Sequence, residues 1–532
     1  MLRLIPTALV SLCAAALLAA GQALACSSII VTPGASTDGS AFITYTCDWW
    51  AHGYMPYTPA ADHAPGDSLR IGDAAIPQVP HTYAVMANRL NEHQVGTSET
   101  TFGGREELRN PEGGLFYSTL MHLALQRSTT ARQAIVVMGE LLEAFGYNAT
   151  GESFSVCDPK EAWIMELIGK GPGVKGAVWV ARRVPDGYIS CHTNKARIGT
   201  FPLDDPENCL YSQDVISFAV ERGYYDPDSG EPFSFHDAYD PDTARNRRYG
   251  ATRVWSVFRR AAPSREFSPD YHRGVESAEP YPLWIKADRK LAYADVLDLM
   301  RDHYEGTAYD MTKGEDAGPF GTPNRARPIT WEVDGNQYAW ERPLATFNVS
   351  HTYVIQVRSW LPAQVGGVLW YSYDDPYTNC YVPMYVPMDE LPRPFTTGTR
   401  GEFNGESLWW MFDFVGNWAN LKYSYMIEDI QAVQGDLEGH FIALQPAVEK
   451  TALELLATDP DLARQYLTNY SVTQSELVLR RWQALAKLLI RKYTDGYIAD
   501  EKGDVVEPGY PEEYLRGLVE RQPDRFLLGP AD

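Results

Sequence analysis

The sequence predicts an α+β fold in which antiparallel sheets carry helices on their outer faces. Short β-prone runs at 27–31 and 41–45 flank a turn rich in Pro, Gly and Asp, which indicates a hairpin. A further strand is predicted at 83–86. After a helical segment, the chain returns to strands separated by turn residues, at 153–156, 162–167, 177–181 and 188–191.

The helical segment begins after Thr130. Thr130 and Gln133 form a capping-box pattern, and Gly146 follows the last apolar residue of the segment. The apolar residues recur at helical spacing, at Ile135, Val136, Met138, Leu141, Leu142 and Phe145. We therefore predict a helix over 131–145.

The C-terminal part of the chain is predicted to be mainly helical. Long stretches with helical apolar spacing occupy 423–456, 460–468 and 473–493. We expect a main domain over 26–420 and a mainly helical C-terminal region over 421–532, after a removed segment 1–25. Within the main domain, residues 307–327 are rich in Gly, Pro and Asp, which predicts a long loop that can border a pocket.

The first 25 residues have the three parts of a secretory signal. Arg3 lies near the start, an apolar run covers 8–20, and Ala23-Leu24-Ala25 forms a small-residue cleavage site. The sequence therefore predicts a signal peptide, export to the periplasm or the medium, and a mature chain that begins at Cys26. No transmembrane segment is expected, because no stretch reaches 18 uninterrupted apolar residues.

Composition and motifs limit the kinds of partner and cofactor that we expect. A net charge of −23 argues against nucleic acid, whose phosphates the chain would repel. The sequence contains no His-Glu-x-x-His, no Cys-x-x-Cys and no phosphate-binding glycine loop, so no metal and no cofactor is expected. Six cysteines remain after residue 25, which is too sparse for a disulfide framework, although one or two bridges stay open.

An N-terminal cysteine can carry out amide hydrolysis with few helpers. Hydrolysis needs a nucleophile, a base and donors for the oxyanion. The α-amine of Cys26, with a reference pKa of about 7.7 to 8.0, could take the proton of its own thiol. A bacterial lipoprotein also begins at cysteine, but its signal usually has Leu three residues before and a small residue two before. Ala23 and Leu24 have the opposite order, which favours ordinary cleavage.

Several separated motifs carry a family resemblance. They are Cys26 with Asp38-Gly39-Ser40 and Asp48, Asn91-Glu92-His93-Gln94, and the stretches 98–104, 130–134, 145–147, 151–154, 158–163 and 192–198. In order and spacing, from Cys26 to about Tyr385, they resemble the dipeptidase A family of cysteine N-terminal nucleophile (Ntn) hydrolases.

This resemblance implies a four-layer αββα Ntn-hydrolase sandwich, cleavage of dipeptides and no need for a metal. By analogy with penicillin V and bile-salt acylases, Asp48 would hold the N-terminal amine. Asn194 would donate to the oxyanion, and Arg253 would lie near the nucleophile. The second oxyanion donor stays open between Thr101 and a backbone N–H. In many relatives an arginine stands where this chain has Tyr45, so the family's positive charge is missing there.

We therefore expect an exported cysteine peptidase that hydrolyses dipeptides, with Cys26, Asp48, Asn194 and Arg253 as its catalytic residues. Two alternatives remain open. One is an Ntn amidase or acylase acting on a nonpeptide amide, which would use the same groups. The other is a lipid-anchored binding protein without catalysis. The sequence leaves the side-chain preference and the oligomeric state open, a homo-oligomer included.

Overall fold

The computed structural model describes residues 25–72 and 74–528, and it confirms the α+β class. The predicted signal peptide lies outside the described residues apart from Ala25. One antiparallel sheet has seven strands, in the order β16 (Trp284–Ile285), β14 (Ile189–His192), β1 (Ala25–Val31), β2 (Ala41–Asp48), β19 (His351–Val357), β20 (Val368–Tyr373) and β21 (Val382–Tyr385). The other has eight, in the order β15 (Cys209–Tyr211), β13 (Ala177–Arg183), β12 (Ala162–Gly169), β11 (Glu152–Cys157), β10 (Gly96–Thr101), β9 (Leu90–Asn91), β8 (Val85–Met86) and β3 (Tyr57–Thr58).

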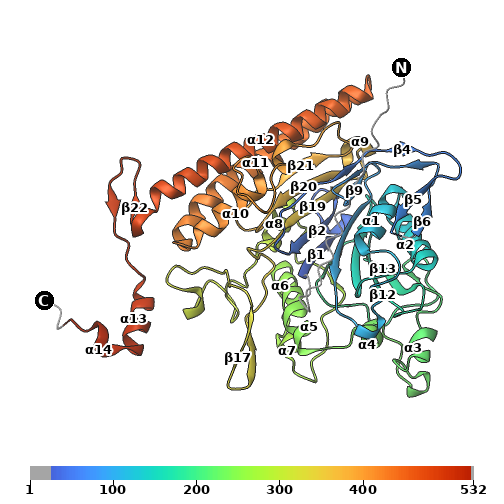
Figure 1. Ribbon diagram of the computed structural model, residues 1–532, viewed down its shortest axis with the longest axis horizontal. Coiled ribbons are helices and arrows are strands. Elements are labelled where there is room, and N and C mark those ends of the chain that lie inside the picture. Colours follow the sequence, from blue (N-terminus) through green and yellow to red (C-terminus); the bar gives the residue numbers. More distant parts are fainter. Residues whose placement is uncertain (1–24, 73, 529–532) are drawn as a thin grey trace.

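The two sheets pack against each other through β1 and β2 on one side and β10 and β11 on the other (Figure 1). At the centre of this contact, the Ser28 hydroxyl lies 2.8 Å from the hydroxyls of both Ser98 and Ser155. Nearby, the Tyr353 hydroxyl donates to the carbonyl of Thr97 at 3.0 Å. Hydroxyl groups are therefore buried between the sheets, and these four have hydrogen-bond partners.

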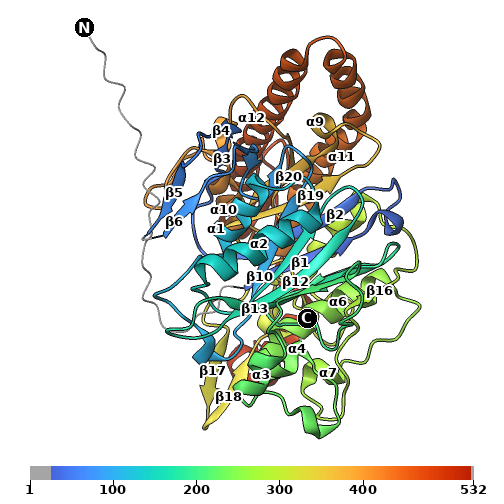
Figure 2. The same cartoon turned by 90° about the vertical axis from the view of Figure 1, so that its right-hand side faces the viewer.

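Helices cover the outer faces. Helices α1 (Tyr117–Gln126) and α2 (Ala131–Phe145) pack on the eight-stranded sheet, whereas α10 (Leu408–Ala419), α11 (Tyr423–Leu456) and α12 (Pro460–Lys492) pack on β20 and β21 (Figure 1). Figure 2 shows α11 and α12 side by side as an antiparallel pair. None of the helices in the described residues is long and apolar enough to cross a membrane.

Most elements agree with the predictions from sequence. Helix α2 has the predicted bounds, because the Thr130 hydroxyl accepts the Gln133 N–H at 3.1 Å and Gly146 ends the helix with a φ of 80°. Helix α12 is continuous where two helices were expected. The strand expected at 83–86 is shorter, since the N–H groups of its first two residues donate to Gln126 and Glu92 rather than to a strand. The domain boundary near residue 420 stays a prediction.

The predicted hairpin at the start of the mature chain forms β1 and β2. Their register pairs Ile30 with Ile43, Cys26 with Cys47, and Ala25 with Asp48. Strand β1 is also bound on its other edge by β14, so it is an interior strand of the sheet. Residues 28–31 are consequently paired on both edges, whereas residues 25–27 pair with β2 alone.

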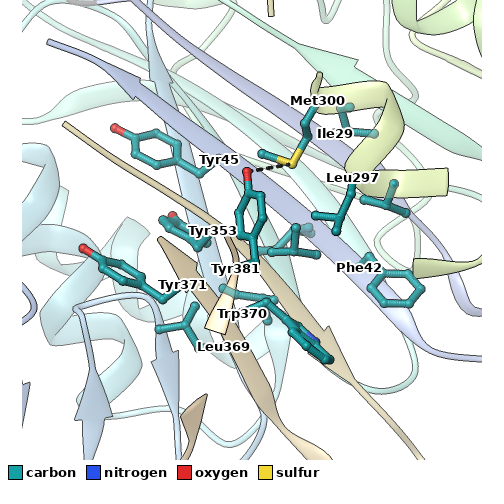
Figure 3. Close-up of a cluster of buried hydrophobic side chains, with 14 of the residues drawn as sticks. Ile29, Phe42, Tyr45, Leu297, Met300, Tyr353, Leu369, Trp370, Tyr371 and Tyr381 are labelled. Carbon is teal, nitrogen blue, oxygen red and sulfur yellow. Dashed lines mark hydrogen bonds between the residues drawn. The ribbon is translucent and has the colours of Figure 1, made fainter. Parts of the chain in front are cut away.

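A row of tyrosines crosses the same sheet. Tyr45, Tyr353 and Tyr371 stand opposite one another on β2, β19 and β20 and point to the same side (Figure 3). The ring centroids of Tyr45 and Tyr353 are 5.1 Å apart, and those of Tyr353 and Tyr371 are 6.4 Å apart. This stacked row is buried and makes β2 rigid close to Cys26.

Candidate active site

Cys26 is the second residue of β1 and only 2% of its surface is exposed. Further along the strand, Ile29 and Ile30 are fully buried and fix the position of β1. The backbone nitrogen of Cys26 donates to Oδ1 of Asn194 at 3.2 Å. Its Sγ lies 3.4 Å from the hydroxyl of Tyr45. Both reactive atoms of Cys26 thus have defined polar neighbours.

Arg253 ties these groups together. It comes from α6 (Thr252–Ala261) and is fully buried. Its Nη1 donates to the carbonyl of Cys26 at 2.7 Å and to the hydroxyl of Ser27 at 2.8 Å, and its Nη2 donates to Oδ1 of Asn194 at 2.7 Å. Because a guanidinium can only donate, it fixes which end of the Asn194 amide faces Cys26.

The other end of the Asn194 amide points elsewhere. Its Nδ2 donates to the carbonyl of Thr101 at 2.6 Å, at the end of β10. The segment around Asn194 lies close to the start of α6, where the Thr193 hydroxyl donates to the carbonyl of Gly250 at 2.9 Å. A Cβ at Gly250 would lie 3.2 Å from that hydroxyl, so a glycine permits this close approach.

Asp48 ends β2 and is buried opposite Ala25, the residue that precedes Cys26. Its Oδ2 lies 3.4 Å from Nε of Arg342. In the part of the chain that is described, neither oxygen of the carboxylate has a hydrogen-bond partner of normal geometry. Burial raises the pKa of Asp48, whereas the positive charges of Arg342 and Arg253 act against this rise. Asp48 is therefore a buried carboxylate beside the bond that the predicted cleavage would break.

Three charged residues near the nucleophile were not predicted. The Tyr45 hydroxyl donates to the carboxylate of Glu99 on β10, and the guanidinium of Arg89 lies over the Tyr45 ring, 5.1 Å from its centroid. On β11, Glu152 accepts the Thr101 hydroxyl at 3.0 Å. The Thr101 hydroxyl, a candidate oxyanion donor, is thus directed at Glu152. The one signal in the sequence that this part of the site differs from that of the relatives was Tyr45, which stands where many of them have an arginine.

The environment of the thiol keeps it protonated. Burial raises the pKa of the Cys26 thiol well above its ordinary value, and contact with Cys47 and the charge of Glu99 raise it further. Burial likewise raises the pKa of Glu152, and the neighbouring Glu99 adds to this effect. A thiol of this kind attacks a carbonyl only if a base removes its proton, so the site needs a base next to Sγ.

The remaining cysteines are thiols. Across 25–72 and 74–528, Cys47, Cys157, Cys191, Cys209 and Cys380 form no disulfide. The described part of the chain contains no cluster of His, Cys, Asp and Glu side chains arranged to hold a metal ion. Cys47 is the thiol closest in register to Cys26, directly across the strand pair.

Comparison with known proteins gives the class of the molecule. The model of peptidase family C69 matches residues 54–436, which include Asn194 and Arg253 and begin after Cys26 and Asp48. Because this match covers more than half of the chain, the molecule is a peptidase. The chain belongs to peptidase family C69.

Curated relatives carry dipeptidase names. A probable dipeptidase from Salmonella dublin is 28% identical over 399 residues, which cover 70% of this chain and 84% of the relative. Dipeptidase A from Lactobacillus helveticus is 24% identical and covers 78% of this chain and 84% of its own length. A probable dipeptidase A from Streptococcus pyogenes serotype M3 is 24% identical over 86% of this chain and 96% of its own length.

Proposed function

We propose that this chain is an exported cysteine dipeptidase of the Ntn class, in which Cys26 is the nucleophile and its own α-amine is the base. The observation that carries the proposal is the convergence of three side chains, two of them buried and Asn194 partly buried, on the first residues of β1. Arg253 binds the carbonyl of Cys26, Asn194 binds its nitrogen, and Asp48 lies opposite the residue before it. The names of the relatives support dipeptides as substrates.

The first step forms an acyl-enzyme. The α-amine takes the proton of Sγ while the sulfur bonds to the scissile carbonyl carbon. Asp48 and Oδ1 of Asn194 hold the resulting ammonium, since a carboxylate and an amide oxygen both accept its hydrogens. When the tetrahedral intermediate collapses, the C–N bond breaks and the ammonium returns its proton to the departing amine.

The second step releases the product. Water gives a proton to the same α-amine and attacks the thioester, and the thiol leaves with that proton. In both steps, negative charge develops on the carbonyl oxygen of the substrate. Nδ2 of Asn194 gives one hydrogen to the carbonyl of Thr101 and donates its second hydrogen to the oxyanion, and Arg253 is a positioning residue that holds the other end of this amide. The second donor is a backbone N–H, because the Thr101 hydroxyl gives its one hydrogen to Glu152.

The arrangement of layers supports the αββα architecture of the Ntn class. Helices lie outside each of two packed antiparallel sheets (Figure 2), and the proposed nucleophile Cys26 is the second residue of β1. The signal sequence supports export, which would produce the free amine that the mechanism needs.

The test combines processing with activity. We would purify the protein from the envelope of its host, measure its intact mass, sequence its N-terminus, and incubate the same sample with a mixture of dipeptides and a set of nonpeptide acyl amides. We expect a free N-terminal Cys26 and release of amino acids from dipeptides. Hydrolysis of the acyl amides alone would contradict the peptidase activity. A lipid-bearing N-terminus without turnover would contradict the mechanism.

A further inference from the structure

A second polar region lies directly beside Asp48. A cavity that is partly open to solvent is formed by the chain around 323–329 and around 341–348. The first of these segments continues the Gly- and Pro-rich loop that was expected to border a pocket. Besides Thr346, the polar residues that line the cavity are Asn324, Arg325, Arg327, Glu341, Arg342 and Asn348.

Some of these charges already have partners. Glu341 pairs with Arg248 at 2.7 Å, and Arg325 pairs with Asp316, also at 2.7 Å. These two ion pairs are therefore structural. The cavity wall has two further arginines, and no carboxylate that lines the cavity pairs with either of them.

Arg342 is one of these two arginines. It is only 8% exposed, and among the described residues its Nε has no hydrogen-bond partner. Its one carboxylate neighbour there is Asp48, at 3.4 Å. Arg327 is the other arginine; it is exposed, and its Nη2 donates to Oδ1 of Asn348, a neutral group, at 3.1 Å. Asp48 is thus the one carboxylate among the described residues within ion-pair distance of either arginine, and it contacts Arg342 alone.

The surplus of positive charge has an electrostatic signature. Burial and the charges of Arg253 and Arg327 together lower the pKa of Arg342 to about 10, while Asp48 and Cys26 act in the opposite direction. Cleavage before Cys26 would add an ammonium group, whose positive charge would also interact with the Asp48 carboxylate. An anion bound in the cavity would relieve this imbalance.

We propose that Arg327 and Arg342 form a subsite for the α-carboxylate of the dipeptide substrate. This inference rests on the proposed function and makes it more specific. Arg342 connects the cavity wall to Asp48, which stands opposite the residue before Cys26, and one residue of extended chain spans at most about 3.6 Å. A single amino acid after the scissile bond places its carboxylate here, and a longer peptide has an uncharged amide at that position. The subsite thereby selects dipeptides.

The test compares substrates that differ only in this carboxylate. The mature enzyme is given alanyl-alanine and alanyl-alanine amide, and kcat and KM are measured for each. We expect the amide to have a KM about 10- to 100-fold higher, because it lacks a charge-assisted contact. Arg327→Gln should raise KM for alanyl-alanine by a similar factor, leave kcat within about twofold, and not change KM for the amide. Arg327→Lys should restore part of the loss.

Controls separate this subsite from a general effect of charge. Arg516→Gln removes an exposed arginine of α13 (Glu512–Arg521), far along the chain from the cavity. It should change neither kcat nor KM for either substrate. Binding to the Cys26→Ala variant, measured by calorimetry, should favour alanyl-alanine over its amide.

Three results would overturn the proposal or its basis. Equal kcat/KM for the two substrates in the wild type would overturn the subsite while leaving the dipeptidase intact. An equal loss on both substrates in Arg327→Gln would do the same. Failure of the wild type to cleave either substrate would reject the proposed function itself, and the subsite with it.

Discussion

The thiol of Cys26 and the hydroxyl of Tyr45 lie 3.4 Å apart on adjacent strands. Tyr45 has one hydroxyl hydrogen and directs it at Glu99, so its oxygen accepts the hydrogen of the thiol. The contact therefore stabilises the protonated thiol. Tyr45 occupies the position of the family's arginine, and the nearby cation, Arg89, reaches the face of its ring from another strand.

The first prediction concerns this charge environment. Glu99→Gln should lower the pKa of the Cys26 thiol, because it removes a negative charge that opposes formation of the thiolate. The pH profile for alkylation of Cys26 by iodoacetamide, followed by mass spectrometry, should then shift to lower pH. Glu512→Gln, at an exposed site, should leave the profile unchanged. A shift to higher pH would show that Glu99 does not act on the thiol by its charge.

The second prediction concerns the nucleophile. Cys26→Ala should fold normally but lose nearly all dipeptide hydrolysis, because the sulfur that forms the acyl-enzyme is gone. Cys209→Ser, which changes a thiol on the edge strand β15, should retain activity. Initial rates on a dipeptide at matched concentrations of folded enzyme give the comparison. If the alanine variant retained a tenth of the activity, Cys26 could not be the nucleophile.

The third prediction concerns the oxyanion. Asn194→Ala should lower kcat by roughly 10² to 10³ if its Nδ2 donates to the developing charge. Asn336→Ala, on the exposed hairpin of β17 (Thr330–Val333) and β18 (Asn336–Ala339), is the matched control. A loss smaller than threefold would assign the donor to another group, such as a backbone N–H.

The fourth prediction concerns stability. Asp413 on α10 lies near buried Asp374, and burial raises the pKa of Asp413 to about 6. Because the folded pKa exceeds the unfolded value of 3.8, the native state binds more protons between about pH 4 and pH 6, and stability falls as pH rises through this window. Asp413→Asn should therefore stabilise the protein at pH 7.5 by about 1 to 3 kcal/mol.

Thermal unfolding measured by circular dichroism at two pH values checks this expectation. The Tm of Asp413→Asn should exceed that of the wild type at pH 7.5, and the difference should vanish near pH 4, where the wild-type carboxyl is also neutral. An unchanged or lower Tm at pH 7.5 would mean that the ionised carboxylate has no net cost in the folded protein.

Local structure was predictable because its determinants are adjacent in the sequence. The cap at Thr130 and the stop at Gly146 define α2 without reference to the rest of the chain. The β1–β2 hairpin likewise follows from its turn and flanking β-prone residues. The strand expected from Tyr83 was shortened by a side chain, Glu92, that competes for the backbone N–H of Ala84, and no local pattern signals such competition.

The surroundings of the candidate site were only partly predictable. Asn194 and Arg253 entered through the family resemblance, and the structure brings both into contact with Cys26. Glu99 lies in the motif 98–104 but was given no role there, and Arg342 lies in none of the motifs. They approach the site because two sheets and a distant loop converge there, and that proximity depends on tertiary packing rather than on spacing along the chain.

Strand β1 has hydrogen-bonded neighbours on both edges. The position of the N-terminus in the sheet therefore depends on the residue at which the precursor is cleaved. A strand advances about 3.3 Å per residue, so a terminus misplaced by one residue would put its amine a full step away from Asn194 and Asp48. The sheet cannot slide to correct this, because a shift of one residue would turn Ser28 to the opposite face, away from the hydroxyls of Ser98 and Ser155 that it contacts between the sheets. In the proposed mechanism the folded precursor is therefore latent, and the fidelity of the trimming protease determines what fraction of the molecules becomes active.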